Sequence, residues 1–185
     1  MKRLDAERVY MRPYEKGDTA MYLAAGLRNR THLAAHEAGN PLNDLDTLDD
    51  ANQLIGDFVA AWESEAALVM GVFDRNTDEW LGQVYVTPTN PDLPEYAIGF
   101  VVDVGHQGRG LMTEAVRAAL EYLFEERGAH RIRSDCSETN ERSWRLLERC
   151  GFTREGHFRE NRRNADGSYR GDYQYGILRR EFPGT

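Results

Sequence analysis

The feature that most constrains this 185-residue chain is a strand, a glycine-rich loop and a long amphipathic helix in direct succession. Residues 95–102 (EYAIGFVV) are rich in β-branched and aromatic side chains, which favours a strand. After the loop, apolar residues recur every four positions from Leu111 to Leu123, the pattern of a helix that packs one face on a core. Gly128 is placed to end that helix. A sheet covered by at least one long helix is therefore predicted.

The loop HQGRG at 106–110 has the chemistry of an anion site. Gly108 and Gly110 let backbone N–H groups approach a ligand with no Cβ in the way. They precede a helix N-terminus, whose free N–H groups and positive dipole end favour phosphate oxygens, and Arg109 adds a positive charge. A glycine-rich turn without a ligand is the simpler alternative. The dinucleotide fingerprint GxGxxG and the Walker pattern GK[ST] are both absent from the sequence.

The other segments predict an α/β (α+β) fold without repeats or an internal linker, and therefore one domain over 1–185. The polar stretch RNTDE at 75–79 indicates a hairpin turn. The further strands are expected at 8–12, 67–74, 80–87, 130–136, 152–160 and 169–178, and the further helices at 18–27, 48–62 and 142–150.

Composition narrows the function classes. The net charge of -8 and the pI near 5.2 disfavour non-specific nucleic-acid binding. They are compatible with a cationic substrate such as an amine, although support of solubility is the simpler reason for such a charge. No apolar run reaches the roughly 18 residues of a membrane span, and no signal peptide is evident, so we expect a cytoplasmic protein. Two cysteines provide no disulfide framework, and His32 and His36 lack further ligands, so no metal is expected.

Two blocks of residues resemble the GNAT superfamily of N-acetyltransferases. The first is Gln107-Gly108-Arg109-Gly110-Leu111-Met112, followed by Thr113, which is similar to the family's acyl-CoA signature Gln/Arg-x-x-Gly-x-Gly/Ala with Met112 in place of the last small residue. The second comprises Asn140, Ser143 and the segment 146–156 (LLERCGFTREG), and it resembles the RimJ/RimL-like ribosomal-protein branch.

The resemblance implies a GNAT fold with a mixed, mostly antiparallel sheet of about six or seven strands flanked by helices. It also implies acetyl-CoA as cosubstrate and a homodimer, by analogy with that branch. The pantetheine arm would lie along Phe100, Val101 and Val102, and the backbone of Gln107–Met112, with Thr113 beyond, would hold the pyrophosphate. Asn140 and Ser143 would face the pantetheine or its thioester end, although Asn140 also suits a helix N-cap.

The implied chemistry is direct attack of a neutral amine on the acetyl thioester, which needs a base. Glu95 opens the strand where the family places a carboxylate base, and a solvated strand-end charge is the alternative. Glu160 is a second candidate base. Where many relatives carry a tyrosine acid this chain has Leu147, so Ser143 is the nearest hydroxyl on that helix.

The acceptor stays open at this point. A protein or peptide N-terminus, of the ribosomal-protein kind, is expected from the branch. A small amine such as a polyamine or an aminoglycoside is the alternative, and a non-catalytic CoA-binding module is the alternative of another class.

Overall fold

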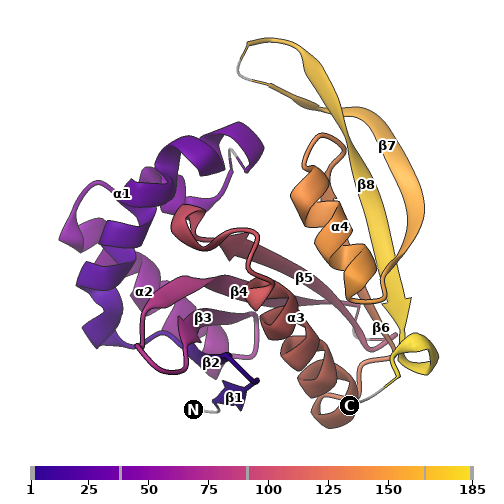
Figure 1. The fold of residues 1–185 in the computed structure, drawn as a ribbon, viewed down its shortest axis with the longest axis horizontal. Coiled ribbons are helices and arrows are strands. Elements are labelled where there is room, and N and C mark those ends of the chain that lie inside the picture. The colour runs from indigo at the N-terminus through magenta and orange to yellow at the C-terminus, as the bar shows by residue number, and fades with distance from the viewer. Residues whose placement is uncertain (1–2, 38, 91, 165, 184–185) are drawn as a thin grey trace. The chain divides into compact units, whose positions relative to one another are not determined.

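The computed structural model describes residues 3–37, 39–90, 92–164 and 166–183. The chain forms two compact units, one of Met1–Thr87 with Phe100–Ala118 and the other of Pro88–Gly99 with Ala119–Thr185. Strand β5 (Glu95–Val102) and helix α3 (Leu111–Glu121), both labelled in Figure 1, each begin in one unit and end in the other.

The first unit has an antiparallel sheet in which strands that follow one another in sequence are neighbours. In this sheet Met11 lies opposite Val72, and Met70 lies opposite Val84. The predicted hairpin turn joins the third and fourth strands. The strands are β1 (Leu4–Asp5), β2 (Val9–Pro13), β3 (Leu68–Asp74) and β4 (Trp80–Asn90).

Two helices of the same unit, α1 (Thr19–His36) and α2 (Leu48–Glu63), bury aromatic and aliphatic side chains with this sheet. Tyr14 and Tyr22 meet edge to face with ring centroids 4.8 Å apart. Both hydroxyls donate to Gln83 Oε1, at 3.2 and 2.9 Å, so a polar group inside the core keeps its hydrogen bonds. Trp80 Nε1 donates to the Tyr14 hydroxyl at 2.8 Å.

The end of β5 lies very close to β4 inside this unit. A Cβ on Gly82 would stand 2.2 Å from the Val101 carbonyl oxygen, a distance that no side chain tolerates. The backbone N–H of Asp103 then donates to the Leu81 carbonyl at 2.9 Å. This contact fixes the point from which the glycine-rich loop starts.

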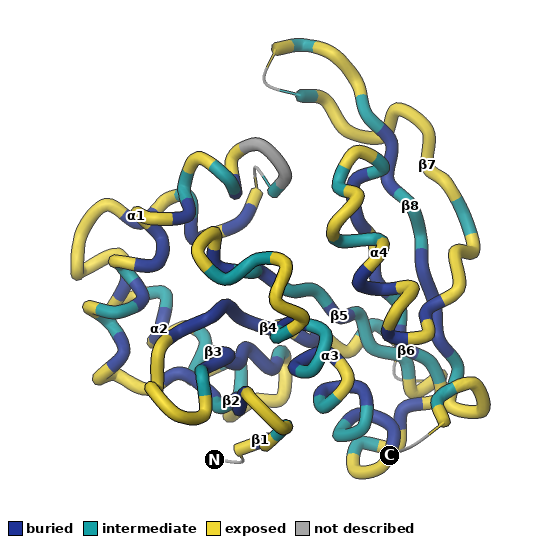
Figure 2. Tube along the Cα trace, viewed as in Figure 1, coloured by how far each residue is buried: buried dark blue, intermediate teal, exposed yellow. Residues whose placement is uncertain are grey.

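The second unit contains the start of β5 and strands β6 (Arg131–Ser137), β7 (Thr153–Arg163) and β8 (Tyr169–Leu178), in the order β5-β6-β8-β7. β5 and β6 are parallel, and their pairing covers only Glu95–Ala97 of β5. Helix α4 (Glu141–Arg149) packs against β6 (Figure 1). β7 is exposed along almost its whole length, as expected for an edge strand (Figure 2).

The expected α/β fold is confirmed, and the described part of the chain contains eight strands rather than six or seven. The added strand is β1, whose two residues are too few for an alternating pattern. Helix α1 continues to His36, well past the predicted end at residue 27. The buried side of this longer helix includes the polar Asn29. The long helix ends its α-helical part at Glu121 and continues as a π-helical turn, Tyr122–Glu126, before Gly128 in a left-handed conformation.

Candidate active site

The glycine-rich loop is exposed and takes a left-handed path at both glycines. Gly108 has φ +77° and Gly110 has φ +78°, a region that residues with a Cβ rarely adopt. Nothing lies within 4 Å of the place where a Cβ of Gly108 would be, so open space adjoins the backbone there. The next residue, Leu111, begins α3, and the first N–H groups of a helix have no partner within it. The loop therefore fits a phosphate ligand.

The start of the loop is held by a buried carboxylate. Asp103 is 1% exposed and accepts hydrogen bonds from the Arg28 guanidinium at 2.8 Å, from Asn29 Nδ2 at 2.8 Å and from the Gly105 N–H at 2.9 Å. Asn29 is fully buried, and its Oδ1 accepts from the Val104 N–H at 2.8 Å. Helix α1 therefore fixes the loop through a side-chain amide that satisfies groups on both sides.

These partners also set the charge state of Asp103. Burial alone would raise the pKa of this carboxyl, but the hydrogen bonds from Asn29, Arg28 and Gly105 outweigh it and hold the pKa below its ordinary value. The side chain is therefore a carboxylate at neutral pH. This anchor was not predicted from the sequence; the polar residue in the buried stripe of α1 was its one visible signal.

The other residues predicted for the cosubstrate have different surroundings. Val101 is buried in the core, whereas Phe100 and Val102 on either side are partly exposed. Met112, in place of the usual small residue, is 4% exposed, and its methyl group would lie 2.7 Å from a Cβ on Gly82. Its side chain therefore belongs to the core, which leaves only its backbone for a ligand. The Gln107 amide lies 3.0 Å from His32 Nε2.

In the second unit, Asn140 and Ser143 lie at the start of α4. Asn140 is the N-cap, and its side chain accepts from the Ser143 N–H at 3.2 Å, so the capping role is confirmed. Ser143 is half-buried and its side chain hydrogen-bonds Cys136 near the end of β6. Burial raises the pKa of the Cys136 thiol to about 12, and Ser143 opposes that rise, so the sulfur stays protonated. Leu147 is fully buried one turn further on.

Glu95 lies in an ion-pair network within the second unit. Its Oε1 accepts from the Thr89 hydroxyl at 2.7 Å, and its Oε2 accepts from Arg131 Nε at 3.0 Å. Arg133 Nε stands 3.5 Å from Oε1. With 17% of its side chain exposed, Glu95 is not the solvated strand-end charge considered above. Both oxygens are engaged, which weakens the carboxylate as an acceptor for a substrate proton.

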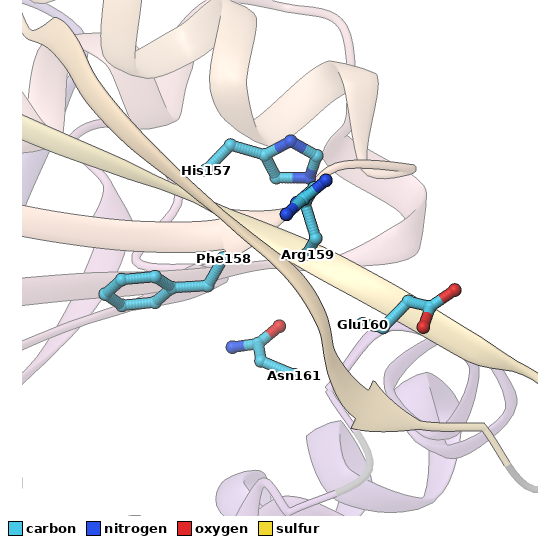
Figure 3. Close-up of a pocket in the computed structure, with 5 residues that line it drawn as sticks. All are labelled: His157, Phe158, Arg159, Glu160 and Asn161. Atoms are coloured by element: carbon cyan, nitrogen blue, oxygen red, sulfur yellow. The ribbon is translucent and has the colours of Figure 1, made fainter.

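Glu160 has the opposite surroundings. It is exposed on β7, where the pairing with β8 breaks between Phe158 and Arg162, and its φ of +52° is unusual for a residue with a side chain. Asn161 and Arg162 beside it both donate to the buried Asp172 at 2.9 Å, which holds the bulge in place. Residues 157–161 line a hollow of about 720 Å³. Figure 3 draws these five residues, with Phe158 and Glu160 at opposite sides of the view.

The strand register separates the two candidate bases. Glu95 lies opposite Arg131, the first residue of β6, whereas Cys136 and Ser143 mark its other end. Cys136 is five residues beyond Arg131, and a strand rises about 3.3 Å per residue, so Glu95 and Cys136 are roughly 16 Å apart along β6. Ser137 lies opposite Asp172, which lies opposite Phe158, so the bulge that carries Glu160 is level with the end of β6. The structure therefore does not bring the predicted pair Glu95 and Ser143 together.

A family model described as an acetyltransferase (GNAT) domain matches residues 8–153. The chain belongs to the GNAT acetyltransferase family. The protein is accordingly an acyltransferase, as its two sequence blocks predicted. Among the described residues, no helix is long and apolar enough to cross a membrane, and no group of three or more His, Cys, Asp or Glu is placed to hold a metal ion. The side chain of His36 lies outside the described residues.

Similar proteins agree with this assignment. The probable N-acetyltransferase YjcK of Bacillus subtilis is 30% identical over 159 residues, which are 85% of this chain and 87% of that protein. The ribosomal protein uS5-alanine N-acetyltransferase of Escherichia coli is 31% identical over 51% of this chain and 50% of its own length. A solved structure of RimL, a ribosomal L7/L12 alpha-N-protein acetyltransferase in complex with coenzyme A, superposes with a TM-score of 0.87 at 17% identity and covers 96% of this chain and 98% of that one. The RimJ/RimL-like fold is thereby confirmed.

Proposed function

We propose that this protein transfers the acetyl group of acetyl-CoA to a primary amine, and that the amine is the N-terminus of a protein or peptide. The observation that supports acetyl-CoA as cosubstrate is the exposed loop, with two left-handed glycines, just before α3. The names of the E. coli protein and of RimL both specify a ribosomal protein as acceptor, and the RimL structure contains coenzyme A, which supports a protein acceptor here. The two units would then form a single N-acetyltransferase domain, located in the cytoplasm and paired as a homodimer.

In this proposal the pyrophosphate lies on the backbone of residues 107–112, and the pantetheine arm follows residues 100–102. The pairing of β5 with β6 covers Glu95–Ala97, which precede the residues proposed to bind the arm. The thioester would reach Ser143 and Asn140. Ser143, whose side chain contacts Cys136 near the end of β6, would hydrogen-bond the departing thiolate and relay a proton to it from solvent.

The carboxylate best placed to accept the amine proton is Glu160. It is exposed, it is level with the end of β6, and the strained bulge that carries it is held by hydrogen bonds to the buried Asp172. Strained backbone of this kind is found at functional sites more often than elsewhere. Glu95, the first candidate from the sequence, is engaged by two arginines and is proposed as a structural link between β5 and β6.

A matched pair of variants tests the cosubstrate loop. Asn and Asp both tolerate a left-handed backbone, so Gly108→Asn preserves the loop whereas Gly108→Asp adds a negative charge where phosphate should bind. We expect Gly108→Asp to weaken acetyl-CoA binding at least tenfold more than Gly108→Asn in isothermal titration. Equal affinity in the two variants would remove the loop from the site.

The acceptor is tested separately by thiol release from acetyl-CoA. We expect peptides with a free N-terminus to be acetylated and the same peptides with a blocked N-terminus to be inert. Spermidine and an aminoglycoside serve as small-amine competitors in the same assay. Faster thiol release with either small amine than with every peptide would contradict the acceptor class while leaving the acetyltransferase assignment intact.

A further inference from the structure

The far end of the loop is held by a residue from a distant part of the sequence. Arg8 precedes β2, yet its guanidinium forms an ion pair with Glu114 in the first turn of α3, with Nε 2.5 Å from Glu114 Oε1. The backbone N–H of Arg8 donates to the other oxygen of Glu114 at 3.0 Å. The same guanidinium donates through a terminal nitrogen to the carbonyl oxygen of Arg109 at 3.2 Å. One side chain therefore links the helix to the loop.

The contact with the Arg109 carbonyl has a stereochemical consequence. This carbonyl and the N–H of Gly110 belong to one peptide group, and no peptide bond among the described residues is cis. In a trans peptide the C=O and the N–H point in opposite directions. Because Arg8 holds the carbonyl on its own side, the Gly110 N–H is turned away from Arg8 and outward from that contact.

The orientation of the peptide group between Arg109 and Gly110 needs an external contact to fix it, because Gly110 is a glycine. Gly110 has φ +78°, and glycine occupies left-handed and right-handed regions almost equally, so the peptide before it is intrinsically free to turn over. A peptide turned the other way would present a carbonyl oxygen to a phosphate and repel it. The Arg8 hydrogen bond selects one of the two orientations before any ligand arrives, which reduces the ordering cost of binding.

We propose that Arg8 is a positioning residue for the cosubstrate: through the Arg109 carbonyl it sets the Gly110 N–H to bind the pyrophosphate, and Glu114 holds Arg8 in place. This inference rests on the proposed function and extends it. Arg8 does not act as a phosphate ligand itself, because its charge is already matched by Glu114, of which 22% is exposed.

The test compares two acetyl donors. S-acetylpantetheine has the thioester and the pantetheine arm but lacks the pyrophosphate and the nucleotide. We expect Arg8→Gln to weaken acetyl-CoA binding about tenfold in isothermal titration, the loss expected for one well-placed hydrogen bond to a charged ligand. Turnover at saturating acetyl-CoA, and kcat/KM with S-acetylpantetheine, should stay within about twofold of wild type, because neither depends on the pyrophosphate contact.

A second variant decides between positioning and direct attraction. If Glu114 holds Arg8 in place, Glu114→Gln should also weaken acetyl-CoA binding. If Arg8 instead attracts the phosphates by charge, removal of the Glu114 charge should strengthen binding. Arg3→Gln is the matched control, because Arg3 forms a comparably exposed ion pair with Asp5 and should leave affinity unchanged.

The outcomes are separable. Unchanged acetyl-CoA affinity in Arg8→Gln, tighter binding in Glu114→Gln, or an equal loss with S-acetylpantetheine would each overturn the role of Arg8 alone. Absence of acetyl-CoA binding by the wild-type protein would overturn the proposed function and this inference with it.

Discussion

The loop after β5 and the hairpin of β7 and β8 each contain residues with a role in the proposed function, and they are built differently. The loop is held at its start by the buried Asp103 and at its end by the pair of Arg8 and Glu114, and it offers backbone to a ligand. The hairpin presents side chains instead. On its edge strand Phe158 is 56% exposed, and Glu160 lies at a bulge whose neighbours are fixed by Asp172.

This difference indicates which of the two regions determines specificity for the acceptor. A cosubstrate that is common to the whole family can be bound by backbone groups, which leaves little freedom for side chains around the loop except at its anchors. An acceptor that differs between relatives needs side chains that can change without loss of the fold. Substitutions at the loop anchors should therefore reduce both stability and acetyl-CoA binding, whereas substitutions in the hairpin should change turnover alone.

The largest effect is expected at the loop anchor. Asp103→Asn removes the buried charge that Arg28 and Asn29 both contact, and it forces an amide N–H toward donors. We expect the free energy of unfolding to fall by about 3 kcal/mol in urea denaturation at pH 7. Acetyl-CoA binding should weaken as well. A variant as stable as wild type would mean that the loop does not depend on this anchor.

The pH dependence of this loss of stability tests the role of the Asp103 charge directly. The pKa of Asp103 is lower in the folded protein than its ordinary value of 3.8, so the unfolded chain takes up the proton first as the pH falls. The stabilisation is therefore complete above about pH 5 and is lost as the pH falls below 3.8. The stability difference between wild type and Asp103→Asn should stay constant from pH 7 to 5 and shrink at lower pH.

The sequence predicted the loop better than its anchors for a physical reason. Two glycines before an amphipathic helix form a local pattern, and their conformational freedom is visible in the residue types themselves. The anchors depend on contacts between residues 74 to 106 positions apart, which no local pattern contains. The end of α1 was predicted at residue 27, nine residues before its observed end at His36, and Asn29 lies in the part that was missed.

The two candidate bases were harder to distinguish from the sequence for a similar reason. Glu95 and Glu160 both lie on strands and both are carboxylates, so residue type cannot distinguish them. The register of four strands and the bulge in β7 separate them, and a bulge leaves no clear signal in a polar stretch such as FRENRR at 158–163. Leu147, by contrast, is excluded as an acid by its residue type alone, because an aliphatic side chain has no proton to give.

The next largest effect is expected in the hairpin. Glu160→Gln should lower turnover about 10²-fold, the scale of general-base assistance, while acetyl-CoA affinity and the free energy of unfolding stay near wild type. The loss should shrink at high pH, where more of the acceptor amine is already neutral. Ser143→Ala is the companion variant and should lower turnover without this pH dependence. Full activity in Glu160→Gln would exclude the hairpin carboxylate as the base.

The smallest effect on chemistry is expected at Glu95. Glu95→Gln keeps an oxygen that can accept from Thr89 or Arg131, but it removes the negative charge beside both arginines, of which Arg131 has a second ion pair, with Glu155. Stability should therefore fall by about 1 kcal/mol, and turnover should change less than threefold at any pH. The matched measurement is the pH profile of kcat for Glu95→Gln beside that of Glu160→Gln. A hundredfold loss in Glu95→Gln that shrinks as the pH rises would return the role of base to Glu95, because a structural ion pair has no reason to follow the protonation state of the substrate amine.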